Sequence, residues 1–284
     1  MPAEPFVLSP ASLAEAHAAL AGGPWRPMAG ATDLLVQING DLGPTPERVL
    51  DLWHLGELRG ISILDDRLHI GALTTFSELR GSALVAELLP VAAEIAATIG
   101  AAQIQNRGTV GGNLANASPA GDTLPLWLAS DADIVLTGPS ADRAVSADTF
   151  FLGYRKTALR PDELVLRVEV PLVPHRQYRF RKVGTRQAQA ISKVVMVVSW
   201  VTTTSGAWTN VRVALGSVAA TPVRSPATEA ALEGRMPTAE LAERAADALM
   251  AEIEPIDDVR STADYRRLVA GRILHRIIRE AGAW

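Results

Sequence analysis

The chain has 284 residues, of which 48% are hydrophobic and 20% are charged, and 27 Lys and Arg against 31 Asp and Glu give a net charge of −4 at pH 7. This composition is typical of a globular protein, and the length indicates two domains or one large domain with an appendage. The mild acidity argues against nucleic acid or an anionic membrane as the main partner.

The sequence contains no cysteine. Thiolates are the ligands of iron–sulfur clusters and of most structural zinc sites, and the nucleophiles of thiol enzymes, so this chain performs none of that chemistry. The amino terminus lacks the pattern of a secretory signal, and the most apolar segment, 83–102, is interrupted by Glu87, Pro90 and Glu94. We therefore expect a cytoplasmic protein without a membrane span.

The first hundred residues alternate short strand and helix signals. Thr75 and Glu78 have the spacing of a capping box, and Pro90 is expected near the first turn of a helix or at a break. Predicted strands cover 6–8, 26–30, 48–52 and 68–73, and predicted helices cover 13–20, a segment that begins at Thr32–Asp33, and one or two helices over 84–102.

The segment 107–122 differs from the rest of the chain because it contains four glycines, two asparagines and a proline. We expect most of its backbone to adopt unusual conformations.

After this segment, the pattern predicts strands at 134–136 and 164–170, and Pro171 and Pro174 end the second of them. We predict a domain boundary near residue 174. Three strand-like runs then cover 177–183, 193–201 and 208–215, and helical segments follow at 228–232, 238–251 and 264–280. A run of strands followed by a run of helices indicates an α+β domain. In the last helix Tyr265, Leu268, Val269, Ile273 and Ile277 share one face.

Several common sites are absent from the sequence. It has no P-loop, Rossmann fingerprint, zinc-protease motif or nucleophile elbow, and the five histidines lack metal-ligand spacing. We expect no metal site and no catalytic side chain.

Two glycine-bearing turns remain as candidate sites. The turn Gly30–Asp33 follows a strand and opens a helix, so its backbone amides would converge on one point and bind an anion such as phosphate. The turn Thr109–Asn113 has paired glycines where a ligand can approach the backbone. Each turn alone is also compatible with a plain connection or hairpin. Together they suggest a dinucleotide lying between two subdomains.

Five segments, in order, are similar to the FAD-binding medium subunits of the molybdenum hydroxylases, the xanthine dehydrogenase and aerobic carbon monoxide dehydrogenase family. These segments are 28–35, 70–72, 103–113, 117–122 and 180–192. The resemblance implies a two-subdomain FAD-binding domain of the vanillyl-alcohol-oxidase type at 1–174, with subdomains of about 1–55 and 56–174. It also implies a C-terminal domain at 175–284 with a three-stranded antiparallel sheet and a helical bundle.

The family's cofactor contacts map onto particular positions. The resemblance implies that the first loop and the second loop bind the FAD diphosphate, that Asp122 contacts the cofactor, that Val165 touches the flavin, and that Lys182 lies beside the isoalloxazine. A solvated lysine at a strand edge is the alternative for Lys182. The residues implied to bind FAD are Ala29, Gly30, Ala31, Thr32, Asp33, Leu34, Thr109, Gly111, Gly112, Asn113, Ser118, Asp122, Val165 and Lys182. On this basis Gly111→Val would block the diphosphate without disturbing the fold.

The resemblance also implies the function and the partners. A large subunit would carry the molybdenum cofactor, a small subunit would carry [2Fe-2S] clusters, and this chain would pass electrons from FAD to an external acceptor, in a dimer of heterotrimers. The flavin would carry the chemistry. Two departures from the family pattern are Gln105, where many relatives have arginine, and Gln189–Ala190, where other branches have an acidic residue.

Three other readings stay open at this stage. The chain could be a stand-alone FAD-dependent oxidoreductase, a flavin-binding structural subunit without turnover, or an α+β protein whose glycine loops are only turns. Among the six tryptophans, Trp208 and Trp284 could lie at subunit contacts or in ordinary core and surface positions.

Overall fold

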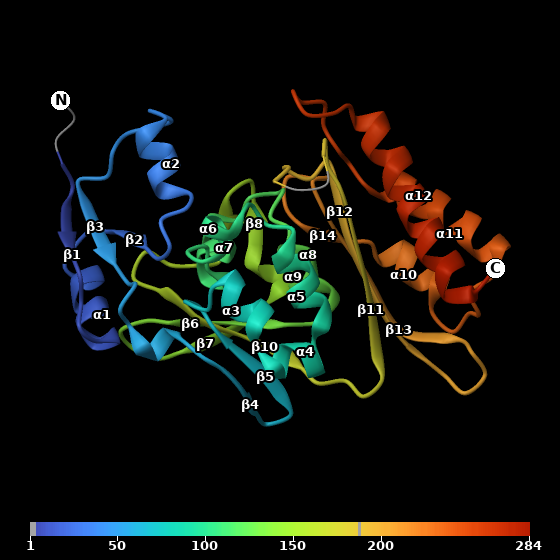
Figure 1. The fold of residues 1–284 in the computed structure, drawn as a ribbon, viewed down its shortest axis with the longest axis horizontal. Coiled ribbons are helices and arrows are strands. Elements are labelled where there is room, and N and C mark those ends of the chain that lie inside the picture. The colour runs from blue at the N-terminus through green and yellow to red at the C-terminus, as the bar shows by residue number, and fades with distance from the viewer. Residues whose placement is uncertain (1–3, 187–188) are drawn as a thin grey trace. The chain divides into compact units, whose positions relative to one another are not determined.

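The computed structural model describes residues 4–186 and 189–284 (Figure 1). The chain forms two compact units. Unit 1 comprises the residues up to 116 together with 133–150 and 157–170, and unit 2 comprises 117–132, 151–156 and 171–284. Two short segments of the predicted first domain, 117–132 and 151–156, therefore pack with the C-terminal part of the chain.

Unit 1 begins with a small parallel sheet of order β1-β3-β2. The hydroxyl of Ser12 accepts a hydrogen bond from the Glu15 amide, which starts the first helix as its sequence predicted. The elements of this layer are β1 (Phe6–Leu8), α1 (Leu13–Ala21), β2 (Arg26–Met28), α2 (Leu34–Asn39) and β3 (Arg48–Asp51). The predicted strands and helices of this region are confirmed.

The second layer of unit 1 is a five-stranded sheet of order β4-β5-β10-β6-β7. Thr75 and Glu78 form the predicted capping box, and Pro90 occupies the first turn of a helix. The strands are β4 (Ile61–Leu64), β5 (Arg67–Gly71), β6 (Asp133–Thr137), β7 (Arg143–Ser146) and β10 (Leu164–Pro171). The helices are α3 (Phe76–Gly81), α4 (Ala83–Leu88), α5 (Pro90–Ala97), α6 (Ala102–Gln105), α7 (Val110–Asn116) and α9 (Ala147–Phe150), with a 3-10 turn η1 (Gly56–Leu58).

The two layers of unit 1 share one hydrophobic core. Leu50 of β3 and Leu52 just after it pack with Leu73 beyond β5 and with Leu164 and Leu166 of β10. All five side chains are buried. The register of β10 against β6 shifts between Val165 and Arg167, a β-bulge of the kind found beside functional sites.

The glycine-rich segment is more regular than its composition predicts. Residues 110–116 form helix α7, and only Ala117, at φ 45°, has a positive φ among the non-glycine residues of 107–122. The cause is Thr109, whose hydroxyl accepts from the Gly112 amide while its carbonyl accepts from the Asn113 amide. This is N-capping geometry, and it outweighs the low helix propensity of two glycines.

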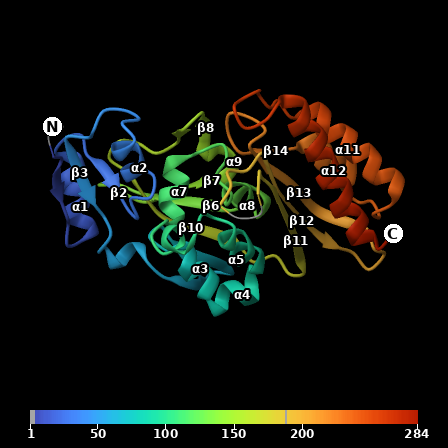
Figure 2. The same ribbon diagram turned by 45° about the horizontal axis from the view of Figure 1, so that its top comes forward.

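Unit 2 is built on an antiparallel sheet of order β11-β12-β13-β14. Helix α8 (Leu124–Ala129) contacts strands β12 to β14, and the C-terminal helices pack beside one another (Figures 1 and 2). The remaining elements are β8 (Phe151–Gly153), β9 (Lys156–Thr157), β11 (Arg176–Val183), β12 (Val194–Thr202), β13 (Trp208–Gly216), β14 (Val223–Arg224), α10 (Pro226–Leu232), α11 (Ala239–Glu252) and α12 (Ala263–Gly282). The two-residue strand β14 corrects the prediction of three strands.

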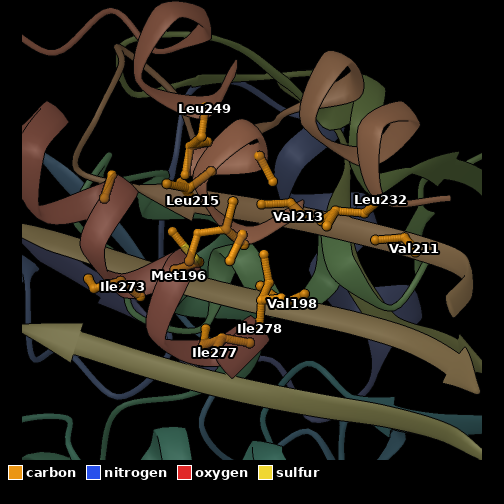
Figure 3. Packing of buried hydrophobic residues seen from close by; sticks show 14 of the residues in the cluster. Met196, Val198, Val211, Val213, Leu215, Leu232, Leu249, Ile273, Ile277 and Ile278 are labelled. Atoms are coloured by element: carbon orange, nitrogen blue, oxygen red, sulfur yellow. The ribbon is translucent and has the colours of Figure 1, made fainter. Parts of the chain in front are cut away.

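The core of unit 2 lies between the sheet and helices α10 to α12. Figure 3 shows Met196 and Val198 of β12 meeting Leu215 of β13 and Ile273 and Ile277 of α12. Strand β12 is buried over seven successive residues because α8 covers its other face.

Two residues of helix α12 differ from their predicted roles, and for Trp208 the structure decides between the two alternatives. Tyr265 and Leu268 are 41% and 45% exposed, whereas Arg266 and Ala270 lie on the buried face of α12. Trp208 is 2% exposed and stacks on Trp200 with ring centroids 4.2 Å apart, which makes it a core residue and not a contact residue. Trp284 stays 43% exposed.

Three arginines of unit 2 converge on one carboxylate, that of Asp131. Arg176 Nη2 lies 2.8 Å from Oδ2, Arg212 Nε lies 2.6 Å from Oδ1, and Arg224 Nη1 lies 3.8 Å from Oδ1. Burial raises the pKa of Asp131, but hydrogen bonds from Arg212 and Arg176 outweigh it and hold the pKa below its usual range. The cluster joins the end of α8 to β11, β13 and β14.

Asp131→Asn should destabilise the chain by about 2 kcal/mol at pH 7, because it takes the Asp131 counter-charge away from the buried guanidinium group of Arg176. Asparagine tolerates the left-handed φ of 53° at this position, so the substitution removes mainly the charge. Urea unfolding followed by circular dichroism measures the effect. The matched control is Asp264→Asn, at an ion pair whose carboxylate is 98% exposed and where we expect almost no change.

The same pair of variants tests how the stabilisation by Asp131 depends on pH. Because the folded pKa of Asp131 is depressed, its contribution is present above the ordinary aspartate pKa of about 4 and is lost as the pH falls through the folded value. The difference between the parent chain and Asp131→Asn should therefore shrink on acidification. A difference that stays constant down to acid pH would contradict the role of the charge.

Candidate functional site

A cavity of about 780 Å³ opens within unit 1. It lies against the β2–α2 loop, the start of α7 and the segment 157–165. Its volume is within the range of ligand-binding pockets. Eleven of the fourteen predicted cofactor-binding residues line it, namely Ala29, Gly30, Ala31, Thr32, Asp33, Leu34, Thr109, Gly111, Gly112, Asn113 and Val165.

The first loop, which we define as residues 29–34, offers unbonded backbone amides. Ala31 has a left-handed φ of 64°, and Asp33, the N-cap of α2, is in the right-handed region. Within residues 4–186 and 189–284, no hydrogen bond is found for the amides of Gly30, Ala31, Thr32 or Asp33. Successive amides in this arrangement form a nest, a concavity that binds anions.

The second loop, residues 109–113, uses most of its backbone amides within the chain. Four successive amides donate within the chain: Val110 to Thr74 O (3.0 Å), Gly111 to Ala72 O (2.8 Å), Gly112 to the Thr109 hydroxyl (3.1 Å) and Asn113 to Thr109 O (3.0 Å). The second loop therefore contributes a wall of small residues to the cavity, whereas the donors for an anion come from the first loop.

A side chain at Gly111 would collide with the chain itself. A Cβ at this position would lie 2.6 Å from the Cβ of Ala72 and 2.9 Å from its carbonyl oxygen. The expectation that Gly111→Val leaves the fold intact is wrong, because its side chain would collide with the residue after β5. A Cβ at Gly112 would instead approach only the Thr109 hydroxyl, at 2.9 Å, and the Ala29 Cβ, at 3.9 Å.

The first loop contacts the residues on both sides of the second loop. A Cβ at Gly30 would lie 1.6 Å from the Arg107 carbonyl oxygen, so the backbones touch there. Asn116, at the end of α7, donates from Nδ2 to Asp33 Oδ1 at 2.9 Å. On the other side, the Arg107 guanidinium stacks on the Trp53 ring at 3.6 Å. Sequence reasoning missed Asn116 and Trp53, because only the folded chain brings them to the loops.

The segment 157–165 contains a buried glutamate that is paired with Arg143 of β7. Glu163 is 8% exposed and accepts two hydrogen bonds of 2.7 Å from Arg143. These bonds hold the pKa of Glu163 below its usual range, so it stays a carboxylate. Val165 follows at the β-bulge and lines the cavity, as its predicted contact with a ligand requires.

Gln105, the departure from the family pattern, has a structural role. It is 5% exposed, its Nε2 donates to the carbonyls of Ala97 and Ile99, and its Oε1 accepts from Arg80. It fixes the turn before the second loop and does not line the cavity.

The other predicted residues, Ser118, Asp122 and Lys182, belong to unit 2. Lys182 Nζ lies 2.6 Å from Asp122 Oδ2, and both side chains are about 90% buried, which excludes a solvated lysine at a strand edge. Asp122 Oδ1 is buried without a hydrogen-bond partner among the residues that the structure describes. Burial raises the pKa of Asp122, and Lys182 and the Ser192 hydroxyl oppose the shift. Ser118 accepts from the Ala120 amide at 3.3 Å.

The described part of the chain contains no group of three or more His, Cys, Asp or Glu residues that could hold a metal ion. No described helix is long and apolar enough to cross a membrane. Of the segments that carry the resemblance, Gln189 to Ser192 are described, whereas Ala188 lies outside the described residues.

Comparisons with known proteins agree with this geometry. The family model "FAD binding domain in molybdopterin dehydrogenase" matches residues 3–173, and "CO dehydrogenase flavoprotein C-terminal domain" matches 179–281. The chain is 35% identical to the carbon monoxide dehydrogenase medium chain of Hydrogenophaga pseudoflava, over 97% of this chain and 96% of that one. It is 28% identical to the xanthine dehydrogenase FAD-binding subunit of Escherichia coli O157:H7, over 96% and 94%.

Among solved structures, the chain is similar to one from the reconstituted CO dehydrogenase of Oligotropha carboxidovorans. The TM-score is 0.94 at 31% identity, and the alignment covers 100% of this chain and 99% of the other.

Gly30→Ala should lower the melting temperature strongly, by the equivalent of about 3 kcal/mol or more, because its Cβ cannot coexist with the Arg107 carbonyl. Gly112→Ala should cost less than about 1 kcal/mol, because a hydroxyl can move. Gly56→Ala, where a Cβ meets no atom within 4 Å, is the control. Thermal unfolding by circular dichroism ranks the three, and a Gly30→Ala chain as stable as the control would refute the contact between the loops.

Proposed function

Because the chain belongs to the FAD-binding medium subunits of the molybdenum hydroxylases, we propose that it holds FAD in the cavity of unit 1 and delivers electrons to an external acceptor. The chain is a flavoprotein subunit of a molybdenum-containing oxidoreductase. Its partners are a large subunit with the molybdenum cofactor and a small subunit with iron–sulfur clusters. This chain contributes FAD binding, and it needs no cysteine of its own.

The observation that carries the proposal is the nest of unbonded amides in the first loop, within the lining of the cavity. A diphosphate carries two negative charges and many acceptor oxygens, which suit the donors of residues 30–33. Glycine at 111 and 112 leaves the second loop without side chains on that wall. Residues 109–113 would therefore fit against the cofactor by shape, and residues 30–33 would hold its charge.

The remaining residues fit the other parts of FAD. Val165 offers an apolar surface in the cavity, and Asp122 Oδ1 is a buried acceptor that a hydroxyl of the cofactor can satisfy. Lys182 supplies a positive charge whose field favours an anionic, reduced flavin. When bound, FAD supplies the redox chemistry, accepting electrons and releasing them to the acceptor, and the side chains of this chain position and tune it.

Three further features belong to the same proposal. The complex is a dimer of heterotrimers, and the domain boundary falls near residue 174, with subdomains of about 1–55 and 56–174. The oxidised substrate is selected in the large subunit, which agrees with the similarity of this chain to subunits of complexes named for carbon monoxide and for xanthine.

The first test is the visible spectrum of the purified chain, alone and co-expressed with the two partner subunits. We expect oxidised-flavin bands in the chain alone, one FAD released per chain on denaturation, and iron–sulfur absorption only in the co-expressed sample. A folded chain that stays colourless in both samples would contradict the proposal. Bound flavin in both samples, with no iron–sulfur absorption in the co-expressed one, would favour a stand-alone oxidoreductase.

Lys182→Met should lower the midpoint potential of the bound flavin, because the reduced anion loses a nearby positive charge. The control is Lys193→Met, which removes an ammonium group that lies over the Tyr265 ring at 5.0 Å. Redox titration of the flavin-loaded chains measures both. Equal potentials in Lys182→Met and the parent chain would remove Lys182 from the site.

A further inference from the structure

Three buried polar side chains lie next to the segment that leads into Asp122, and none of them is among the candidate cofactor-binding residues. They are Ser192, Ser217 and Arg266, which are 1%, 7% and 4% exposed. They come from the segment before β12, the residue after β13 and the first turn of α12, all within unit 2. Polar groups this deeply buried persist where they are fully bonded or have a specific role.

The two serines bond to the backbone just before Asp122. The Ser192 hydroxyl donates to Ala120 O at 3.3 Å and lies 3.0 Å from the Ser217 hydroxyl. The Ser217 hydroxyl donates to Ser192 O at 2.9 Å, and the Ser217 amide donates to Pro119 O at 2.8 Å. Both carbonyls of the segment 119–120 are therefore held by one serine pair.

Arg266 holds the serine pair in turn. Its Nη1 donates to Ser217 O at 2.7 Å and to Lys193 O at 3.3 Å, and its Nη2 lies 2.6 Å from Asp258 Oδ1. A guanidinium group suits this role because its planar donors bind several acceptors in fixed directions.

The backbone at this point is strained, which indicates that its position matters. Ser217 has a left-handed φ of 67°, which is costly for a residue other than glycine or asparagine. A Cβ on the preceding Gly216 would lie 3.1 Å from Pro119 O and 2.7 Å from Val195 Cγ1. Segment 119–120 therefore lies close to the end of β13. Gly216 leaves room for this approach, Ser217 adopts a left-handed φ there, and the buried Arg266 bonds the Ser217 carbonyl.

We propose that Ser192, Ser217 and Arg266 are positioning residues that fix the backbone of 119–120, so that Asp122 is held against Lys182 and its Oδ1 stays available to a ligand. This inference rests on the proposed function of Asp122. The consequence is physical: Coulomb energy at low dielectric varies steeply with distance, so a small shift of Asp122 changes both its pairing with Lys182 and the field at the ligand.

The test is a double-mutant cycle between Ser192→Ala and Asp122→Asn in the full chain. The dissociation constant for FAD is measured by fluorescence titration of the flavin-free chain, and the midpoint potential is measured on the loaded one. We expect Ser192→Ala to weaken FAD binding about tenfold in the parent chain and less than twofold in the Asp122→Asn chain. It should also move the potential in the same direction as Asp122→Asn.

Controls separate positioning from general stability. Ser205→Ala removes an exposed hydroxyl that bonds the Thr203 hydroxyl, and it should leave the FAD affinity and the flavin potential unchanged. Ser217→Ala introduces alanine, which adopts a left-handed φ elsewhere in this chain, at Ala31 and Ala117. This variant should reproduce the effect of Ser192→Ala on FAD affinity. Equal losses of affinity in the parent and Asp122→Asn backgrounds would overturn the inference.

The same cycle is run on urea unfolding of the flavin-free chain. If the shifts of the urea midpoint caused by Ser192→Ala and Asp122→Asn are not additive, the coupling exists without any cofactor and the inference is supported. Additive shifts would overturn it. A parent chain that shows this coupling but binds no FAD would refute the proposed function and leave the network in place.

Discussion

Much of unit 1 depends on one contact between two backbones. The α-carbon of Gly30 lies so close to the Arg107 carbonyl that a single added carbon would overlap it. This contact places the first loop on the residue that leads into the second loop. The Arg107 side chain is fixed from the other side by the Trp53 ring, which also carries the Arg59 guanidinium at 4.6 Å. A glycine, a tryptophan and two arginines thus determine where the wall of the cavity lies.

The contact also explains why the two glycine loops play different roles. The amides of the second loop are used by helix α7 and by carbonyls of the segment after β5, because Thr109 caps a helix there. The first loop packs on Arg107 without amide bonds to it, and Ala31 turns its backbone so that four amides stay available. A site for a large anionic cofactor needs both a smooth surface and a set of donors, and here each loop supplies one of them.

Signals within a few residues predicted most of the fold. The capping box at Thr75, the proline at position 90 and the alternation in β10 each depend on neighbouring residues, and each was found where the sequence indicated. The helix over 110–116 was missed because glycine content was weighed above the Thr109 cap. Features that form only on folding had no such signal.

Those features include the short strand β14, the burial of Trp208 and the bond between Asn116 and Asp33. Each depends on a partner far along the chain. The predicted residues of the first loop could be found because a turn between strand and helix is itself a local pattern. Their partners could not, since nothing in the spacing relates Gly30 to Arg107.

Unit 2 contains two ion-paired aspartates, the half-buried Asp131 and the buried Asp122, whose environments shift the pKa in opposite directions. The contrast separates a structural carboxylate from a candidate site. Asp131 is bonded at both oxygens by guanidinium groups, so its charge is compensated and its pKa is lowered. Asp122 has a single ammonium partner on Oδ2, keeps Oδ1 without a partner among the described residues, and has a raised pKa. A carboxylate that is fully compensated stabilises a fold. A buried carboxylate with one oxygen paired and the other without a partner can still accept a hydrogen bond from a ligand. Groups with a perturbed pKa of this kind concentrate at functional sites.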